Sequence, residues 1–147
     1  MPARSGWGLT PRQSVEFECA RRGEPQVVAG CVALLLGQDA DDDLLRALGG
    51  PNAEMVLDDG PEQRNQYWRR VWGARGLLYA WADHASGAVV AALGDEHWRV
   101  REMAAKVVAR RKLGDAVEAV AALRADPVPR VRAAAERATV ILTAAGS

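Results

Sequence analysis

The sequence predicts an all-α protein built as an α-solenoid, a stack of antiparallel helical hairpins. Two observations support this fold class. Apolar residues recur at helical spacing along most of the chain, between residues that start helices and glycines that end them. A short pattern also returns after about 30 residues, a period typical of helical repeats. One hairpin cannot bury its apolar face alone, so neighbouring hairpins are expected to stack.

The repeated pattern is clearest in the C-terminal half. The stretch DEHWRVREMAA begins at Asp95 and returns as DPVPRVRAAAE, which begins at Asp126. We therefore predict one domain over 1–147, with repeats at about 11–50, 65–93, 95–124 and 126–144, an irregular connection at 51–64 and a flexible stretch at 1–9.

Each repeat is predicted to hold two helices. After Asp95, one apolar face contains Val100, Met103, Ala104, Val107 and Val108. After Asp126, the equivalent face contains Val131, Ala134, Ala135, Ala138 and Leu142. Gly114 is expected to end the first helix and Asp115 to cap a second. That second helix, at about 116–123, should bury Val117, Val120 and Leu123.

The N-terminal half follows the same plan. Thr10 and Gln13 predict a capping box at the start of a helix that stops at Gly23. The next helix should bury a stripe that includes Cys31, and the acidic run DADDD starts a further helix of about ten residues. That run is not a calcium loop, because the glycine and glutamate that an EF-hand requires are missing. Gly73 and Gly76 are expected to allow close approach of two helices.

Composition limits the class of protein. The chain has 147 residues, 49% of them hydrophobic and 26% charged, and no apolar run approaches the length of a membrane span. No signal-like segment is seen at the start, so we expect a cytoplasmic protein without a membrane segment. Cys19 and Cys31 are twelve residues apart, which is not a zinc spacing, and no metal or cofactor is expected.

The net charge of zero hides an asymmetry. Residues 1–60 hold 5 basic and 10 acidic residues, whereas residues 61–147 hold 14 basic and 9 acidic residues. Such polarity matters for partners. However, the pI of about 6.7 lies below the value of about 9 that many nucleic-acid-binding domains exceed.

The stretches LGDEHWRVREMAAKVVARRKLGD and RADPVPRVRAAAERATVIL resemble HEAT repeats, in the short HEAT-like variety of phycobilisome lyases. The residues that match are Asp95, Val100, Arg101, Ala104, Ala105, Gly114 and Asp115, then Asp126, Val131, Arg132 and Ala135. The resemblance implies a right-handed superhelix of hairpins. Members of this family are usually adaptors, and some bind tetrapyrroles or act on alkylated DNA.

The recurring Asp and Arg residues have two interpretations. They are either a phosphate-binding ladder, or a structural ladder that joins consecutive repeats. Recurrence at the repeat period favours the structural ladder for Asp95, Arg101, Asp126 and Arg132. Arg99 is expected to be freer and exposed, as is Arg130.

Aromatic and basic residues predict an interaction surface. A Trp-Arg pair occurs twice, thirty residues apart, and these pairs should lie on the same side of the stack. The group could stack bases, hold a flat cofactor, bind a protein or simply pack helices together. The residues proposed for this surface are Trp68, Arg69, Trp72, Arg75, Tyr79, Trp98 and Arg99.

No catalytic motif is present. The sequence has no nucleophile elbow, phosphate loop or zinc-protease motif, and Asp83, His84 and Ser86 adjoin in a short turn rather than converging from different elements. The leading hypothesis is therefore a non-enzymatic adaptor that binds a protein. The alternatives are a nucleic-acid-binding protein that uses the basic C-terminal half and, less favoured, a lyase- or glycosylase-like enzyme.

Overall fold

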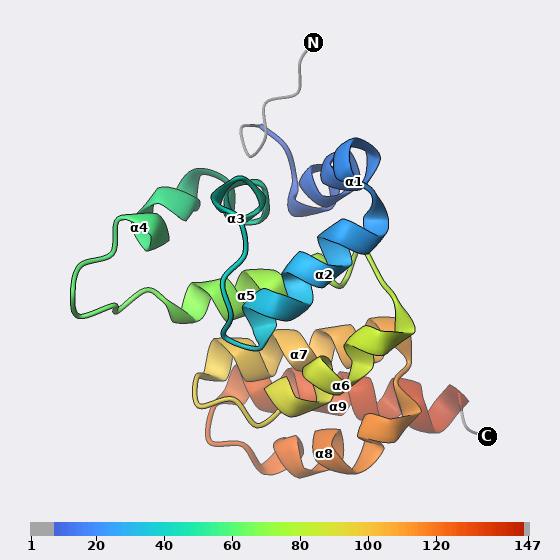
Figure 1. Ribbon diagram of the computed structural model, residues 1–147. Coiled ribbons are helices and arrows are strands. Elements are labelled where there is room, and N and C mark those ends of the chain that lie inside the picture. Colours follow the sequence, from blue (N-terminus) through green and yellow to red (C-terminus); the bar gives the residue numbers. More distant parts are fainter. Residues whose placement is uncertain (1–7, 146–147) are drawn as a thin grey trace. The chain divides into compact units, whose positions relative to one another are not determined.

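The computed structural model describes residues 8–145, and every regular element within them is a helix (Figure 1). The predicted all-α class is confirmed for this part of the chain. The chain divides into two compact units, residues 1–85 and 86–147, and the boundary falls inside the predicted repeat 65–93. The predicted flexibility of residues 1–9 concerns positions that lie mostly outside the described residues.

The first unit begins with α1, which spans Pro11–Arg22, and α2, which spans Glu24–Leu35. The predicted capping box is present: the Gln13 amide donates to Thr10 Oγ1 at 3.1 Å, and the Thr10 amide donates to Gln13 Oε1 at 3.0 Å. Gly23 separates the two helices with a φ of 94°, which favours glycine. The predicted start of α1 at a capping box and its end at Gly23 are therefore confirmed.

The core of the first unit is built around α2. Its inward residues are almost completely buried: Val27, Val28, Cys31, Leu34 and Leu35. α2 packs against α5, which spans Tyr67–Gly76. A Cβ atom on Gly73 would lie 2.7 Å from the Cys31 carbonyl oxygen, and one on Gly76 would lie 2.5 Å from Cys31 Sγ. The prediction that these glycines permit close helix approach is confirmed.

The predicted irregular connection at 51–64 is partly helical. α3 spans Asp42–Gly49, a 3-10 turn covers Gly50–Asn52, and α4 spans Ala53–Leu57. Ala53 and Val56 are buried, and this burial stabilises one and a half turns of helix centred on Met55. Within the predicted connection, the irregular part is residues 58–64.

The second unit consists of α6 (Ser86–Ala92), α7 (Trp98–Arg111), α8 (Val117–Ala122) and α9 (Pro129–Ala145). α7 lies beside α9, α6 packs on α7, and α8 packs on α9 (Figure 1). Short 3-10 turns flank α8 on both sides.

The predicted apolar faces of α7 and α9 form the centre of this unit. On α7, Val100, Ala104, Val107 and Val108 are fully buried, and Met103 is half-buried. All five predicted residues of α9 are buried, with Leu142 the most accessible at 9%. The prediction for α8 is only partly right, because Val120 is buried but Val117 is 37% exposed.

The end of α7 differs from the prediction. The helix stops before Lys112, which adopts the left-handed conformation with φ 54°, rather than at Gly114. The amides of Lys112 and Leu113 both donate to the Val108 carbonyl, which combines the bond of an αL ending with the longer bond of a Schellman ending. Gly114 instead opens the 3-10 turn Gly114–Ala116, so Asp115 does not cap a helix as predicted.

Candidate interaction surface

The structure explains four of the predicted residues as internal connections of the second unit. Arg101 Nε donates to Asp126 Oδ2 at 2.8 Å, and Arg101 Nη2 donates to Oδ1 at 3.2 Å. Arg101 Nη1 also donates to the carbonyls of Asp95 and Glu96 at 3.0 and 3.2 Å. Arg132 Nη1 donates to the Asp126 carbonyl at 2.7 Å. These guanidinium groups therefore join the loop before α7, the loop before α9 and α7 itself.

The electrostatics of Asp126 agree with this structural role. Burial alone disfavours ionisation, yet the hydrogen bonds from Arg101 and from the Val128 amide outweigh it, and the pKa of Asp126 lies below its usual range. Its carboxylate therefore stays charged at neutral pH and holds Arg101 in place. A phosphate ligand at Arg101 would have to displace this carboxylate.

Trp98 lies in a cluster of cations at the start of α7. The guanidinium carbon of Arg99 is 4.5 Å from the centroid of the Trp98 ring, and that of Arg130 is 5.2 Å away. The imidazole of His97 stacks on the same indole, with 6.2 Å between ring centroids. Both contacts with guanidinium groups fall within the range of cation–π attraction. We define His97, Trp98, Arg99 and Arg130 as the Trp98 cluster, in which three side chains contact the indole.

Arg130 has a second partner that anchors the cluster. Its Nε donates to Glu102 Oε2 at 3.0 Å, and Lys106 Nζ lies 3.7 Å from the same oxygen. Glu102 is buried, whereas the side chain of Arg130 is 60% exposed. The prediction that Arg130 is exposed is confirmed. Its contact with Trp98 was not predicted. Arg99 is half-buried rather than exposed.

The aromatic residues of α5 divide into a buried and a half-buried part. Trp72 is 3% exposed, and a Cβ atom on Gly49 would lie 2.5 Å from its ring. Trp68 is half-buried and stacks on Trp72, with 5.9 Å between centroids and 28° between planes. The ring centroid of Tyr67 lies 5.1 Å from that of Trp68. Within α5, Trp72 is a packing residue, and the accessible aromatic side chains are those of Tyr67 and Trp68.

The other predicted residues of this unit have defined places. Arg69 Nε donates to the side-chain oxygen of Gln66, and Gln66 Nε2 donates to the Val56 carbonyl in α4 and to Asp59 in the loop after it. Arg75 Nη2 donates to the Leu48 carbonyl at 2.6 Å, and burial lowers the pKa of Arg75. Tyr79 does not share a helix face with Trp68, because α5 ends at Gly76 and the chain then turns.

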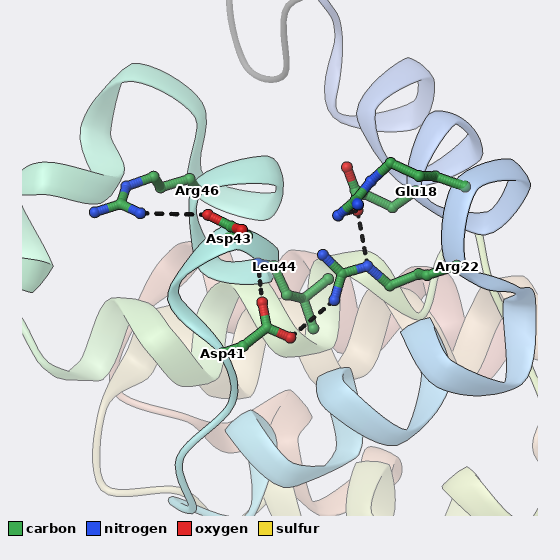
Figure 2. Close-up of polar contacts among 7 residues, drawn as sticks. Glu18, Arg22, Asp41, Asp43, Leu44 and Arg46 are labelled. Carbon is green, nitrogen blue, oxygen red and sulfur yellow. Dashed lines mark hydrogen bonds and ion pairs between the residues drawn. The ribbon is translucent and has the colours of Figure 1, made fainter.

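Sequence reasoning missed a polar network that joins α1 to α3. Glu18 is buried, and its Oε1 accepts from Arg22 Nε at 2.9 Å and from Arg21 Nη2 at 3.0 Å. Arg22 Nη1 also donates to Asp41 Oδ2 at 2.8 Å (Figure 2). Asp41 Oδ1 accepts from the Leu44 amide at 2.7 Å and so caps α3. The spacing of three and four residues between Glu18 and the two arginines is the signal that identifies such a network.

Both cysteine thiols have a pKa above the ordinary value. Burial raises the pKa of the Cys31 thiol to about 12, and burial with nearby Glu24 also raises that of Cys19. Neither is therefore an activated thiolate. Among residues 8–145, no group of three or more His, Cys, Asp or Glu side chains could hold a metal ion. Within the same residues, no helix is both long and apolar enough to cross a membrane.

Comparison of the chain with known protein families, with curated proteins and with solved structures gives no match.

Proposed function

We propose that this chain is a non-enzymatic adaptor built from HEAT-like repeats, stacked as a right-handed solenoid, which binds a protein partner. Equivalent residues of the two C-terminal repeats make equivalent bonds, which supports the repeat assignment. Asp95 Oδ1 accepts from the amide two residues ahead at 2.8 Å, and Asp126 Oδ1 does so at 2.9 Å. Arg101 and Arg132 each donate to the backbone carbonyl of the aspartate six residues before them.

The observation that carries the binding proposal is the Trp98 cluster. Its indole contacts the guanidinium groups of Arg99 and Arg130 and is half-buried. Trp and Arg are the residues most enriched at the centres of protein interfaces, and a side chain fixed in advance loses little entropy on binding. The exposed guanidinium of Arg130 favours a partner surface with acidic or carbonyl groups.

The test is capture of partners by the full chain, followed by measurement of their affinity for variants. The variants are Trp98→Ala and, as a matched control on the same unit, Arg124→Ala, whose ion pair with Glu136 is exposed. We expect Trp98→Ala to weaken binding on the order of 30-fold, as at an interface hot spot, and Arg124→Ala to leave it unchanged. Equal affinities of wild type and Trp98→Ala, with both folded, would refute this surface.

Nucleic-acid binding is the alternative to a protein partner. Four basic residues of the second unit already pair with carboxylates, namely Arg101, Lys106, Arg124 and Arg130. Residues 86–147 hold 10 basic and 7 acidic residues, so the net charge of this unit is only +3. Binding to random duplex or single-stranded DNA that falls steeply with salt would replace the proposal. No binding at micromolar protein and low salt would support the assignment to a protein partner.

A further inference from the structure

Arg75 is a half-buried cation for which the described residues supply no acidic partner. Its Nη2 donates to the Leu48 carbonyl at 2.6 Å, and among residues 8–145 no carboxylate pairs with it. Residues 1–7 contain no acidic side chain. A guanidinium group stays charged in proteins and carries five N–H donors in a planar fork. A cation that is partly removed from water without a counterion favours a ligand that supplies the opposite charge.

The guanidinium lines a pocket of about 160 Å³ formed by the start of α1, the end of α3 and α5. Among the described residues, the polar side chains that line it are those of Arg75 and Ser14, and Ser14 is 3% exposed. The remaining lining is aliphatic or glycine: Leu9, Pro11, Ala47, Leu48, Gly49, Gly50 and Pro51. The pocket therefore offers one positive charge and one hydroxyl in apolar surroundings.

We propose that this pocket binds a carboxylate carried on a short aliphatic stem. The fork of Arg75 matches the two oxygens of a carboxylate, and the hydroxyl of Ser14 lines the same pocket. The aliphatic lining suits a carbon stem. A phosphate dianion fits less well, because one guanidinium neutralises only one of its charges.

The size of the pocket limits the ligand. Its volume equals that of about five water molecules in the liquid, so a group of roughly four to six heavy atoms fits. Two sources carry this chemistry: a free short-chain carboxylate, or an acidic side chain of a polypeptide. The site is separate from the Trp98 cluster, so the proposal does not depend on the proposed function.

The α3 terminus offers the competing explanation. The carbonyls at a helix C-terminus attract a cation, so Arg75 stabilises α3 whether or not the pocket is occupied. A helix-capping role alone predicts no difference between a carboxylate and a neutral molecule of the same shape. This difference is therefore the quantity to measure.

The test is titration of the ¹⁵N-labelled full chain with butyrate, with the neutral isostere butyramide and with inorganic phosphate. We expect butyrate to shift the amide signals of Ser14, Gly49 and Gly50 with a Kd on the order of 1–10 mM. Butyramide and phosphate should bind at least tenfold more weakly. Glutamate blocked at both backbone ends then separates the sources, because its binding shows that a polypeptide side chain fits, and its failure assigns the pocket to a free carboxylate.

Variants provide the second readout. Arg75→Gln should abolish the butyrate shifts, whereas Arg69→Gln, on the same helix but outside this pocket, should leave them unchanged. If Arg75→Gln does not fold, the comparison of butyrate with butyramide on the wild-type chain decides alone. Equal binding of the two molecules, or no shift with either at tenfold above the expected Kd, would overturn the proposal and leave Arg75 as a helix cap only.

Discussion

Removal of the guanidinium from Arg101 is expected to destabilise the second unit strongly. Arg101 makes two hydrogen bonds to the carboxylate of Asp126 and two to backbone carbonyls. The side chain of Arg101 is only 15% exposed, and that of Asp126 only 4%. In Arg101→Met the aliphatic stem remains, but Asp126 becomes a buried charge without its cation. Breaking a buried pair in this way costs about 3–5 kcal/mol of unfolding free energy.

Arg124→Met is the matched control. Arg124 Nε pairs with Glu136 Oε1 at 2.9 Å, a distance similar to that of the buried pair, but these side chains are 51% and 58% exposed. An exposed pair contributes about 0.2–1 kcal/mol, so this variant should unfold almost like the wild type. The contrast between the two variants isolates the effect of burial from the effect of losing an arginine.

The assay is urea unfolding followed by circular dichroism. With an m-value of about 1.5–2 kcal/mol/M, the loss at Arg101 lowers the unfolding midpoint by about 2–3 M. Combining Arg101→Met with Asp126→Asn should cost less than the sum of the two single changes, because they remove one shared interaction. A loss below about 1 kcal/mol for Arg101→Met would refute the structural ladder.

The remaining predictions concern pH, helix ends and packing. The pKa of Asp126 is lower in the folded state, so its contribution is complete above the unfolded pKa of about 3.9 and is lost as pH falls through the folded value. The stability gap between wild type and Asp126→Asn should therefore shrink in urea titrations below about pH 4. Lys112→Gly should raise the unfolding free energy by about 0.5–1 kcal/mol, because Lys112 has a φ of 54°; a loss of stability would contradict the assigned helix end. Gly73→Ala should cost about 1–3 kcal/mol in the same assay, whereas Gly87→Ala meets nothing within 4 Å and should be neutral or stabilising. A maleimide at neutral pH should leave Cys31 unmodified in the folded chain and modify it after unfolding, as measured by mass spectrometry. Rapid modification of Cys31 in the folded chain would show that this thiol is not buried.

Helix positions and buried faces were predictable because they depend on local spacing. The stripe of α9 and the capping box at Thr10 both follow from residues within a few turns of one another. The end of α7 was not predictable in the same way, because Lys112 takes a conformation for which Gly114 appeared the better candidate. The hydrogen bond from the Leu113 amide to the Val108 carbonyl determines where this helix ends, and the preference of glycine for helix ends does not.

In the candidate site, too, contacts between repeated residues were predictable and contacts between distant elements were not. The pairing of Arg101 with Asp126 followed from recurrence at the repeat period, because a repeated contact requires repeated residues. The burial of Trp72 and the unpaired charge of Arg75 depend on residues more than 20 positions away, at the end of α3. No local pattern encodes such contacts, so sequence reasoning grouped both with the exposed aromatic residues.

The central claim is that the Trp98 cluster is the partner-binding surface of a helical-repeat adaptor. The most direct measurement is amide hydrogen exchange of the full chain with and without its captured partner. The account predicts that the partner slows exchange at the start of α7 and at the start of α9, where Trp98 and Arg130 lie. Slower exchange confined to other helices, with these two segments unchanged, would contradict it.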